Sequence, residues 1–173
     1  MRLTFTLLSS FLIICSINAQ QKNVEVEIKQ IKQAYTFINS SKLKSNSYKY
    51  SNKCGVVNAC ITLYYLKGEI VKITDNGIGD DDKAAEKWNY EYYFKSGNLI
   101  FSYEWIKYYD NDLEKSVIDE KKEYFKSNKL LKKIENQKTT YPTNKTINYY
   151  DDRYLLKGIK SVKDINQIYK CLN

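Results

Sequence analysis

The sequence predicts an α+β domain: a six-stranded antiparallel meander of three hairpins, packed by an N-terminal helix and followed by short C-terminal helices. Three observations predict this fold. Residues 22–39 carry an apolar stripe at helical spacing, residues 64–134 repeat a hairpin pattern three times, and residues 161–164 carry a helix-capping pattern. A chain of 173 residues suits one domain of this kind.

The first 19 residues are predicted to be a secretory signal peptide. Arg2 provides a charged start, an apolar run follows, and the small residue Ala19 precedes the expected cleavage. The run is too short for a membrane-spanning helix. We therefore expect residues 20–173 to form a single domain in the periplasm or outside the cell. The alternative is a lipoprotein acylated on Cys15, but Ile14 stands where a lipobox requires a small residue.

An amphipathic helix is predicted over residues 22–39. Apolar side chains recur there at steps of four and three residues, as on one face of an α-helix. They are Val24, Ile28, Ile31, Tyr35 and Ile38. The polar stretch that follows, residues 42–53, is predicted to be a connection or a weak edge strand.

Three hairpins are predicted by an internal repeat. Each unit places two aromatic or apolar residues before a Lys, a turn containing Gly or Asn, and a second apolar run, and the units begin at residues 64, 92 and 123. In the second unit, a four-residue turn that pairs Phe94 with Leu99 would give the hairpin one wholly apolar and aromatic face. This predicted aromatic ladder consists of Trp88, Tyr90, Tyr92, Phe101, Tyr103 and Trp105.

The aromatic ladder has two interpretations. Exposed, it would stack on sugars or on a partner protein, and its six residues would be the binding site. Buried, it would be the inner face of the sheet. The helix stripe just upstream favours the buried interpretation.

Short helices are predicted in the C-terminal part. Ile147, Tyr150 and Tyr154 share one helical face. Ser161 and Asp164 then have the spacing of a capping box and open a second short helix.

Three cysteines follow the signal segment, and an oxidising compartment favours a disulfide between two of them. The near pair, Cys54 and Cys60, is predicted to be bonded. A bond between Cys60 and Cys171, which would staple the C-terminus to the sheet, is the alternative. We expect no metal site, because the sequence has no His and no second cysteine pair. No cofactor is expected either.

The composition excludes several classes of activity. The absence of His from the sequence removes Ser-His-Asp triads, Cys-His dyads and imidazole metal ligands. The 28 basic residues include only two Arg and are scattered, so nucleic acid is not expected as a partner. Two acidic candidates remain: the loop over residues 75–82 as a cation site, and Glu91 with Glu104 as an acid/base pair. A solvated surface is preferred for both, and we expect no enzymatic activity.

The hairpin motif resembles the motifs of two groups of proteins. Residues 91–99 read EYYFKSGNL. They are similar to the EYYF-x-x-G-x-L hairpins of secreted, Bacteroidetes-like proteins of unknown function and, more weakly, to the units of MORN-variant repeat proteins. The resemblance covers about residues 60–135 and implies an array of hairpins without implying an activity.

Together these features predict a secreted or periplasmic, non-catalytic binding protein. Its expected partner is a protein of the cell envelope or the exterior, as for an inhibitor or immunity protein. The alternative is a module associated with carbohydrate or the cell wall, with or without enzymatic activity. The mature chain is not expected to span a membrane.

Overall fold

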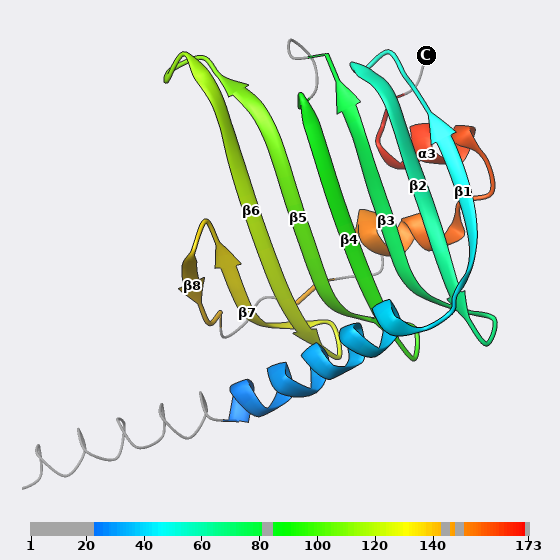
Figure 1. Cartoon of the computed structure of the whole chain (residues 1–173), viewed down its shortest axis with the longest axis vertical. Helices are drawn as coiled ribbons and strands as arrows, with labels where there is room; N and C mark the ends of the chain where they lie inside the picture. The colour runs from blue at the N-terminus through cyan, green and yellow to red at the C-terminus, as the bar shows by residue number, and fades with distance from the viewer. Residues whose placement is uncertain (1–22, 81–84, 143–145, 148–150, 172–173) are drawn as a thin grey trace, which may run out of the picture.

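The structure is a computed structural model that describes residues 23–80, 85–142, 146–147 and 151–171. The predicted signal peptide lies outside these residues. A single antiparallel sheet of eight strands forms the centre, and the strands follow one another in chain order (Figure 1). Among the described helices, none is long and apolar enough to cross a membrane.

The strands are β1 (Lys44–Tyr50), β2 (Val56–Leu66), β3 (Glu69–Gly79), β4 (Lys87–Lys95), β5 (Asn98–Asp110), β6 (Lys115–Lys126), β7 (Lys129–Glu135) and β8 (Lys138–Thr140). The predicted α+β meander is confirmed, but the sheet has eight strands rather than six. The stretch predicted as a connection or weak edge strand contains β1, and β8 adds a short return from β7. Helical segments are the N-terminal helix over residues 23–40, α2 (Asp152–Leu155), the 3-10 turn η1 (Leu156–Gly158) and α3 (Val162–Ile168).

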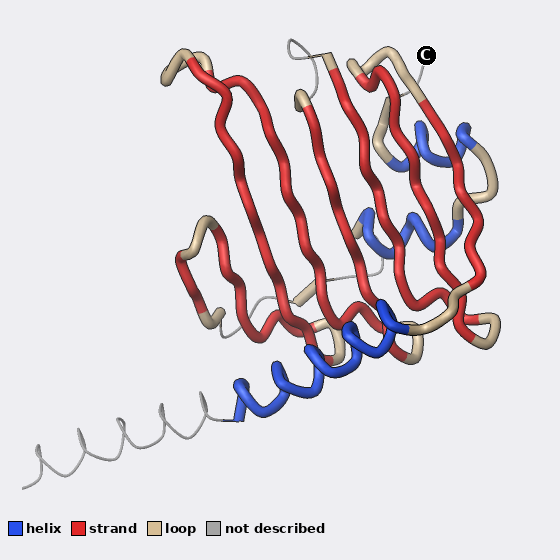
Figure 2. The backbone as a smooth tube through the Cα atoms, viewed as in Figure 1, coloured by secondary structure: helices blue, strands red, loops and turns tan. Residues whose placement is uncertain are grey.

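The three predicted hairpins are present, but the second has a two-residue turn rather than the predicted four-residue turn. The turns are Lys67-Gly68, Ser96-Gly97 and Ser127-Asn128, and every residue in them has a positive φ. Such turns match the right-handed twist of the flanking strands. Because successive strands run in opposite directions, the three turns lie together at one end of the strands, which we call the turn end. The connections β1–β2, β3–β4 and β5–β6 lie at the opposite end of the strands, which we call the loop end (Figure 2).

Each of these hairpins carries one extra residue at the same place in its second strand. The extra residues are Val71, Ile100 and Leu131. A bulge of this kind changes which side chains beyond it point to each face of the sheet. All three bulged side chains join the apolar cluster beneath the N-terminal helix.

The N-terminal helix covers the turn-end half of one sheet face (Figure 1). The predicted stripe is confirmed, since Ile28, Ile31 and Ile38 are buried and Val24 and Tyr35 pack beside them. The aromatic side chains against which the stripe packs are Tyr93, Phe101 and Tyr124.

The helices of the C-terminal segment lie on the other face of the sheet, behind β1 to β3 in Figure 1. Tyr154 is buried there, and its hydroxyl accepts a hydrogen bond from the backbone N–H of Leu99 at 2.9 Å. The capping prediction is confirmed: the backbone N–H of Asp164 donates to Ser161 Oγ at 3.4 Å, and α3 begins at the next residue after Ser161. The predicted first helix begins later than expected, since α2 starts at Asp152 with Asp151 as its N-cap, so that Ile147 precedes it. Tyr150 lies outside the described residues.

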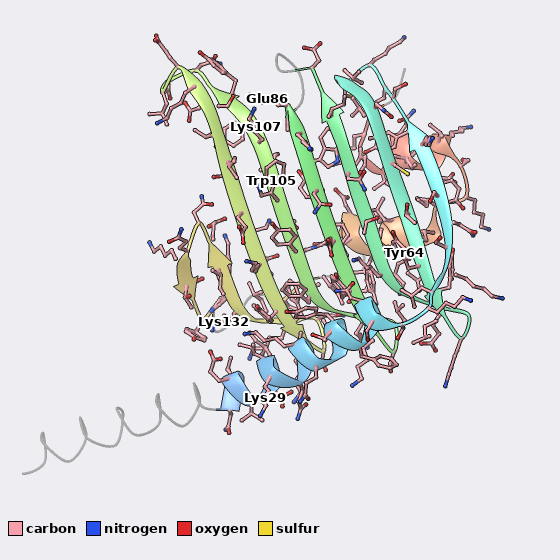
Figure 3. All side chains as sticks on the ribbon, viewed as in Figure 1. Lys29, Tyr64, Glu86, Trp105, Lys107 and Lys132 are labelled. Carbon is pink, nitrogen blue, oxygen red and sulfur yellow. A yellow bond between two sulfur atoms is a disulfide. The ribbon has the colours of Figure 1, made fainter. Side chains whose placement is uncertain are left out.

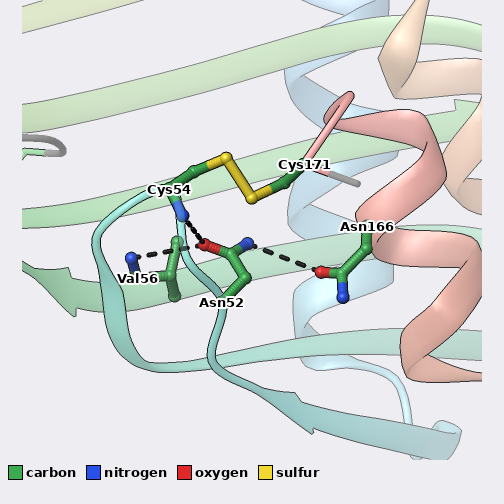
Figure 4. Close-up of a disulfide and its surroundings, with 5 residues drawn as sticks. All are labelled: Asn52, Cys54, Val56, Asn166 and Cys171. Atoms are coloured by element: carbon green, nitrogen blue, oxygen red, sulfur yellow. Dashed lines mark hydrogen bonds between the residues drawn. A yellow bond between two sulfur atoms is a disulfide. The ribbon is translucent and has the colours of Figure 1, made fainter. Parts of the chain in front are cut away.

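The disulfide joins Cys54 to Cys171, with their Cα atoms 5.9 Å apart (Figure 4). The predicted Cys54–Cys60 bond is therefore wrong, and so is the Cys60–Cys171 alternative. Cys60 is unbonded because it lies within β2, with its side chain on the face opposite the C-terminal segment. The C-terminal segment is instead bonded to the β1–β2 loop, which contains Cys54. In that loop Asn52 Oδ1 accepts the backbone N–H groups of Cys54 and Val56, at 3.1 and 3.4 Å.

Candidate functional site

The predicted aromatic ladder is divided between the two faces of the sheet. The pairing of Phe94 with Leu99 is confirmed, but the extra residue Ile100 shifts all later pairs by one, so that Trp105 lies opposite Asn89 rather than Trp88. Side chains alternate along a strand. The side chains on the face of the C-terminal segment are therefore Trp88, Tyr90 and Tyr92. Those on the face of the N-terminal helix are Phe101, Tyr103 and Trp105.

The ladder is also divided in its burial. Trp88, Tyr92 and Phe101 are core residues, each 6% exposed. Tyr90 is half-buried against the C-terminal side, and Tyr103 and Trp105 are half-buried on the side of the N-terminal helix. The buried interpretation thus holds for part of the ladder, while Tyr103 and Trp105 reach a surface that the helix leaves uncovered.

This surface, the open face, is the loop-end half of the sheet above the N-terminal helix, where Figure 3 shows Trp105. The strand registers arrange its side chains in rows that cross the sheet. The central row is Lys49, Cys60, Asn76, Asn89, Trp105 and Glu120. The row nearer the helix is Ser47, Thr62, Thr74, Glu91, Tyr103 and Lys122. The row nearer the loops is Asn58, Ile78, Lys87, Lys107 and Ile118.

A hollow of about 700 Å³ lies on the open face. Aromatic residues, three amides, lysines and one thiol line it. These residues include Asn58, Asn76, Asn89, Tyr103, Trp105, Lys49, Lys87 and Cys60. The hollow thus combines flat apolar surface with exposed donors and acceptors, the composition of a surface that binds another molecule.

A polar cluster lies at the boundary between the N-terminal helix and the open face. Lys72 Nζ lies 2.9 Å from Glu91 Oε2 and donates to Asn39 Oδ1 of the helix at 3.0 Å. The Tyr93 hydroxyl donates to Glu91 Oε2, and it is also within 3.1 Å of Asn39 Oδ1. Burial opposes ionisation of Glu91, but the hydrogen bonds from Tyr93 and Lys72 outweigh it and lower the pKa of this carboxyl. The lower border of the open face is therefore a fixed ion pair tied to the helix C-terminus.

The acidic loop predicted as a candidate cation site begins instead within β3. Asp75 is 1% exposed on the C-terminal side of the sheet. Its carboxylate accepts hydrogen bonds from the Tyr169 hydroxyl at 2.6 Å, Trp88 Nε1 at 3.1 Å and the Tyr50 hydroxyl at 3.2 Å. Burial raises the pKa of Asp75. The carboxylate thus anchors the C-terminal segment, and Asp81 and Asp82 lie outside the described residues.

The proposed acid/base pair is also separated by the sheet. Glu91 lies opposite Tyr103 and Glu104 opposite Tyr90, so the two carboxylates point to opposite faces. Glu104 borders a cluster on the C-terminal side, where Arg153 bonds Asp151 at 2.6 Å and Glu123 at 2.7 Å. The prediction of a same-face pair is wrong, because it assumed the pairing without the bulge.

Sequence reasoning missed the amides and the thiol of the hollow. Asn76 and Asn89 lie opposite each other on β3 and β4, and Cys60 lies beside Asn76 on β2. The signal that would have found them is the two-residue alternation, counted outward from the tight turns with one extra residue in each hairpin.

The two tryptophans should report the two environments separately. In a Trp88→Phe variant, the remaining Trp105 is expected to emit to the red and to be quenched readily by acrylamide, because it is half-buried on the open face. In a Trp105→Phe variant, the remaining Trp88 should emit to the blue and resist quenching until the protein unfolds. Equal shielding of both indoles would contradict the division of the ladder.

Within the described residues, no group of three or more His, Cys, Asp or Glu side chains is placed to hold a metal ion. Comparison of the chain with protein-family models, with curated proteins and with solved structures finds no match. The open face and its hollow are therefore the features from which a function has to be inferred.

Proposed function

We propose that this chain is a non-catalytic binding protein of the cell envelope or the exterior, and that it holds a protein partner on the open face. The observation that supports the proposal is the hollow, in which Trp105 and Tyr103 lie among amides and lysines. The predicted signal peptide and the Cys54–Cys171 disulfide fit an oxidising compartment.

The composition of the open face suits a protein interface. Aromatic residues supply much of the energy at the centres of interfaces, and polar residues form the rim. Here Tyr103, Trp105 and the exposed Ile78 provide the apolar part, and Lys49 and Lys87 lie at its border. The rows run across six strands, so the surface is broad rather than a closed pocket.

A carbohydrate ligand is the second candidate, and one observation favours it. The indole of Trp105 is directly opposite the Asn89 amide, which is directly opposite Asn76. A flat ring flanked by amides can stack on a sugar ring and hydrogen-bond its hydroxyl groups. Enzymatic activity has no such support, because the carboxylates of Glu91 and Glu104 lie on opposite faces.

Replacing Trp105 by Ala is expected to abolish capture of the partner without unfolding the protein. Affinity purification from the native envelope should recover a specific protein with the wild type and lose it with Trp105→Ala. Leu155→Ala is the control, because Leu155 is an exposed apolar residue of α2 in the C-terminal segment, which lies on the other face of the sheet. Retention of the partner by Trp105→Ala would contradict the protein-partner proposal. Binding of the wild type to peptidoglycan or polysaccharide, lost in the same variant, would instead support the carbohydrate candidate.

The free thiol allows a second test without a change to the folded core. Cys60 lines the hollow and is half-buried and unbonded. Attaching a bulky maleimide to Cys60 is expected to block capture of the partner, and a Cys60→Ser variant treated in the same way should capture normally. Full binding by the labelled wild type, with labelling confirmed by intact mass, would place the partner elsewhere.

A further inference from the structure

We propose that the turn end is a contact surface for anionic lipid headgroups, so that the sheet stands upright on a membrane. This inference goes beyond the proposed function and does not depend on it. Its starting point is the repeat, which places a Lys at the beginning of each hairpin turn. These residues are Lys67, Lys95 and Lys126, and all three are exposed.

Because the three turns lie at the same end of the strands, the three lysines of the repeat form a row of positive charges. More lysines join this row from the neighbouring elements. Lys42 and Lys44 lie at the start of β1, Lys129 begins β7, and Lys157 Nζ donates to the carbonyl oxygen of Gly97 at 3.0 Å. The acidic residues nearby are fewer, and one of them, Glu27, is 2.6 Å from Lys126 Nζ. The turn end therefore carries a net positive charge.

The loop end is close to neutral. Its described connections carry acidic residues, namely Asp80, Glu86, Asp110, Asp112 and Glu114, beside the lysines Lys53, Lys87, Lys107 and Lys115. Lys170 also lies there, next to Cys171, which is bonded to Cys54 of the β1–β2 loop. Glu86 is paired with Lys107 and also accepts a hydrogen bond from the Ser116 hydroxyl. Positive charge is thus concentrated at one end of the strands, and a negatively charged surface would attract the turn end more strongly than the loop end.

Exposed apolar side chains lie beside the basic row. Phe37 is 60% exposed and Val26 is 53% exposed, and both project from the N-terminal helix. Eleven residues separate them, which is close to three helical turns, so they share one outward side. Phe37 lines the same groove as Lys67 and Lys95. Aromatic and apolar side chains next to lysines are the combination that binds the interface of an anionic bilayer.

The form of the charge favours lipid over a single anionic ligand. The basic groups are separate ammonium groups on successive turns. They are not a convergent Arg cluster of the kind that binds one phosphate with two parallel hydrogen bonds. Each Lys held close to an anionic bilayer contributes about 1 kcal/mol, and salt screens the attraction over roughly 8–10 Å. A row of such residues can therefore bind a mobile layer of headgroups without a shaped pocket.

The test is binding to vesicles of defined composition. The protein, purified after export with its own signal segment and shown by intact mass to carry no lipid, is floated with vesicles of phosphatidylcholine alone or mixed with phosphatidylglycerol. We expect binding to the mixed vesicles only, with a steep decrease as salt is raised. The triple variant Lys67→Glu, Lys95→Glu, Lys126→Glu is expected to lose at least tenfold in affinity, since about 1 kcal/mol per Lys is removed.

A matched variant separates this surface from net charge. Lys53→Glu, Lys87→Glu, Lys115→Glu changes the net charge by the same amount at the loop end, and it should bind the mixed vesicles nearly as well as the wild type. Phe37→Ser should weaken binding to the mixed vesicles relative to the wild type, and this loss should be similar at low and at high salt. Circular dichroism and thermal unfolding check that each variant is folded. Equal losses in the two triple variants, equal binding to both kinds of vesicle, or binding to DNA or an acidic protein without vesicle binding would each overturn the proposal.

Discussion

Breaking the disulfide is expected to lower the free energy of unfolding by about 3–5 kcal/mol. Cys54 and Cys171 are 117 residues apart, so their bond restricts most of the unfolded chain. A domain of this size has a total stability of only about 5–15 kcal/mol, so the loss would be visible as a large shift of the denaturant midpoint. The measurement is guanidinium unfolding of the oxidised protein.

The third cysteine has to be removed from this comparison, because in a Cys171→Ser variant Cys54 and Cys60 would both be free to pair. The double variant Cys60→Ser, Cys171→Ser is therefore compared with Cys60→Ser alone. Cys60→Ser should stay within about 1 kcal/mol of the wild type, since the thiol is unbonded and half-buried. A double variant as stable as Cys60→Ser, or a peptide map that joins Cys60 to another cysteine, would contradict the assigned pairing.

Replacing Asp75 by Ala is expected to cost at least about 3 kcal/mol. Its carboxylate accepts hydrogen bonds from Tyr50, Trp88 and Tyr169, and each buried donor left without an acceptor costs about 1–3 kcal/mol. Asp75→Asn should cost less, because its carbonyl oxygen can still accept from Trp88 and its amide can donate to a tyrosine hydroxyl. Chemical unfolding of both variants makes the measurement. An Asp75→Ala protein as stable as the wild type would show that the carboxylate does not hold the C-terminal segment.

The same residue predicts a dependence on pH. Burial raises the pKa of Asp75 in the folded protein above its ordinary value of 3.8. As the pH rises past that value, the unfolded chain releases this proton before the folded protein does. The part of the stability that depends on protonated Asp75 is complete below that pH and is lost as the pH rises through the folded-state pKa. As the pH rises above about 4, the stability of the wild type relative to Asp75→Asn should therefore fall. A difference that does not change with pH would contradict the raised pKa.

The local elements were predictable from the sequence because each one is specified within a few residues. The stripe from Val24 to Ile38, the turn at Lys67-Gly68 and the cap at Ser161 depend on spacing and on turn chemistry. The candidate site was less predictable. Ile100 fits an ordinary strand position as well as a bulge, and only packing against the N-terminal helix distinguishes the two. That single ambiguity moved Trp105 from the predicted core face to the open face.

The remaining errors have a common cause, which is contact between distant parts of the chain. Cys54 is close to Cys60 in sequence, but its bond is decided by where the C-terminal segment lies. The sequence predicts a loop position for Asp75, because carboxylates favour solvent. Its burial depends on Tyr169, whose hydroxyl reaches it from 94 positions further along the chain.

The shared position of Val71, Ile100 and Leu131 has a consequence for the evolution and redesign of this protein. Each hairpin brings its own tight turn, its own extra residue and its own apolar contact to the N-terminal helix. A unit of this kind is self-contained along the sheet, since neighbouring units meet only along a strand edge. Duplication or loss of one hairpin would therefore widen or narrow the sheet by two strands and leave the side-chain facing of the remaining units unchanged. The width of the open face can therefore change by whole units.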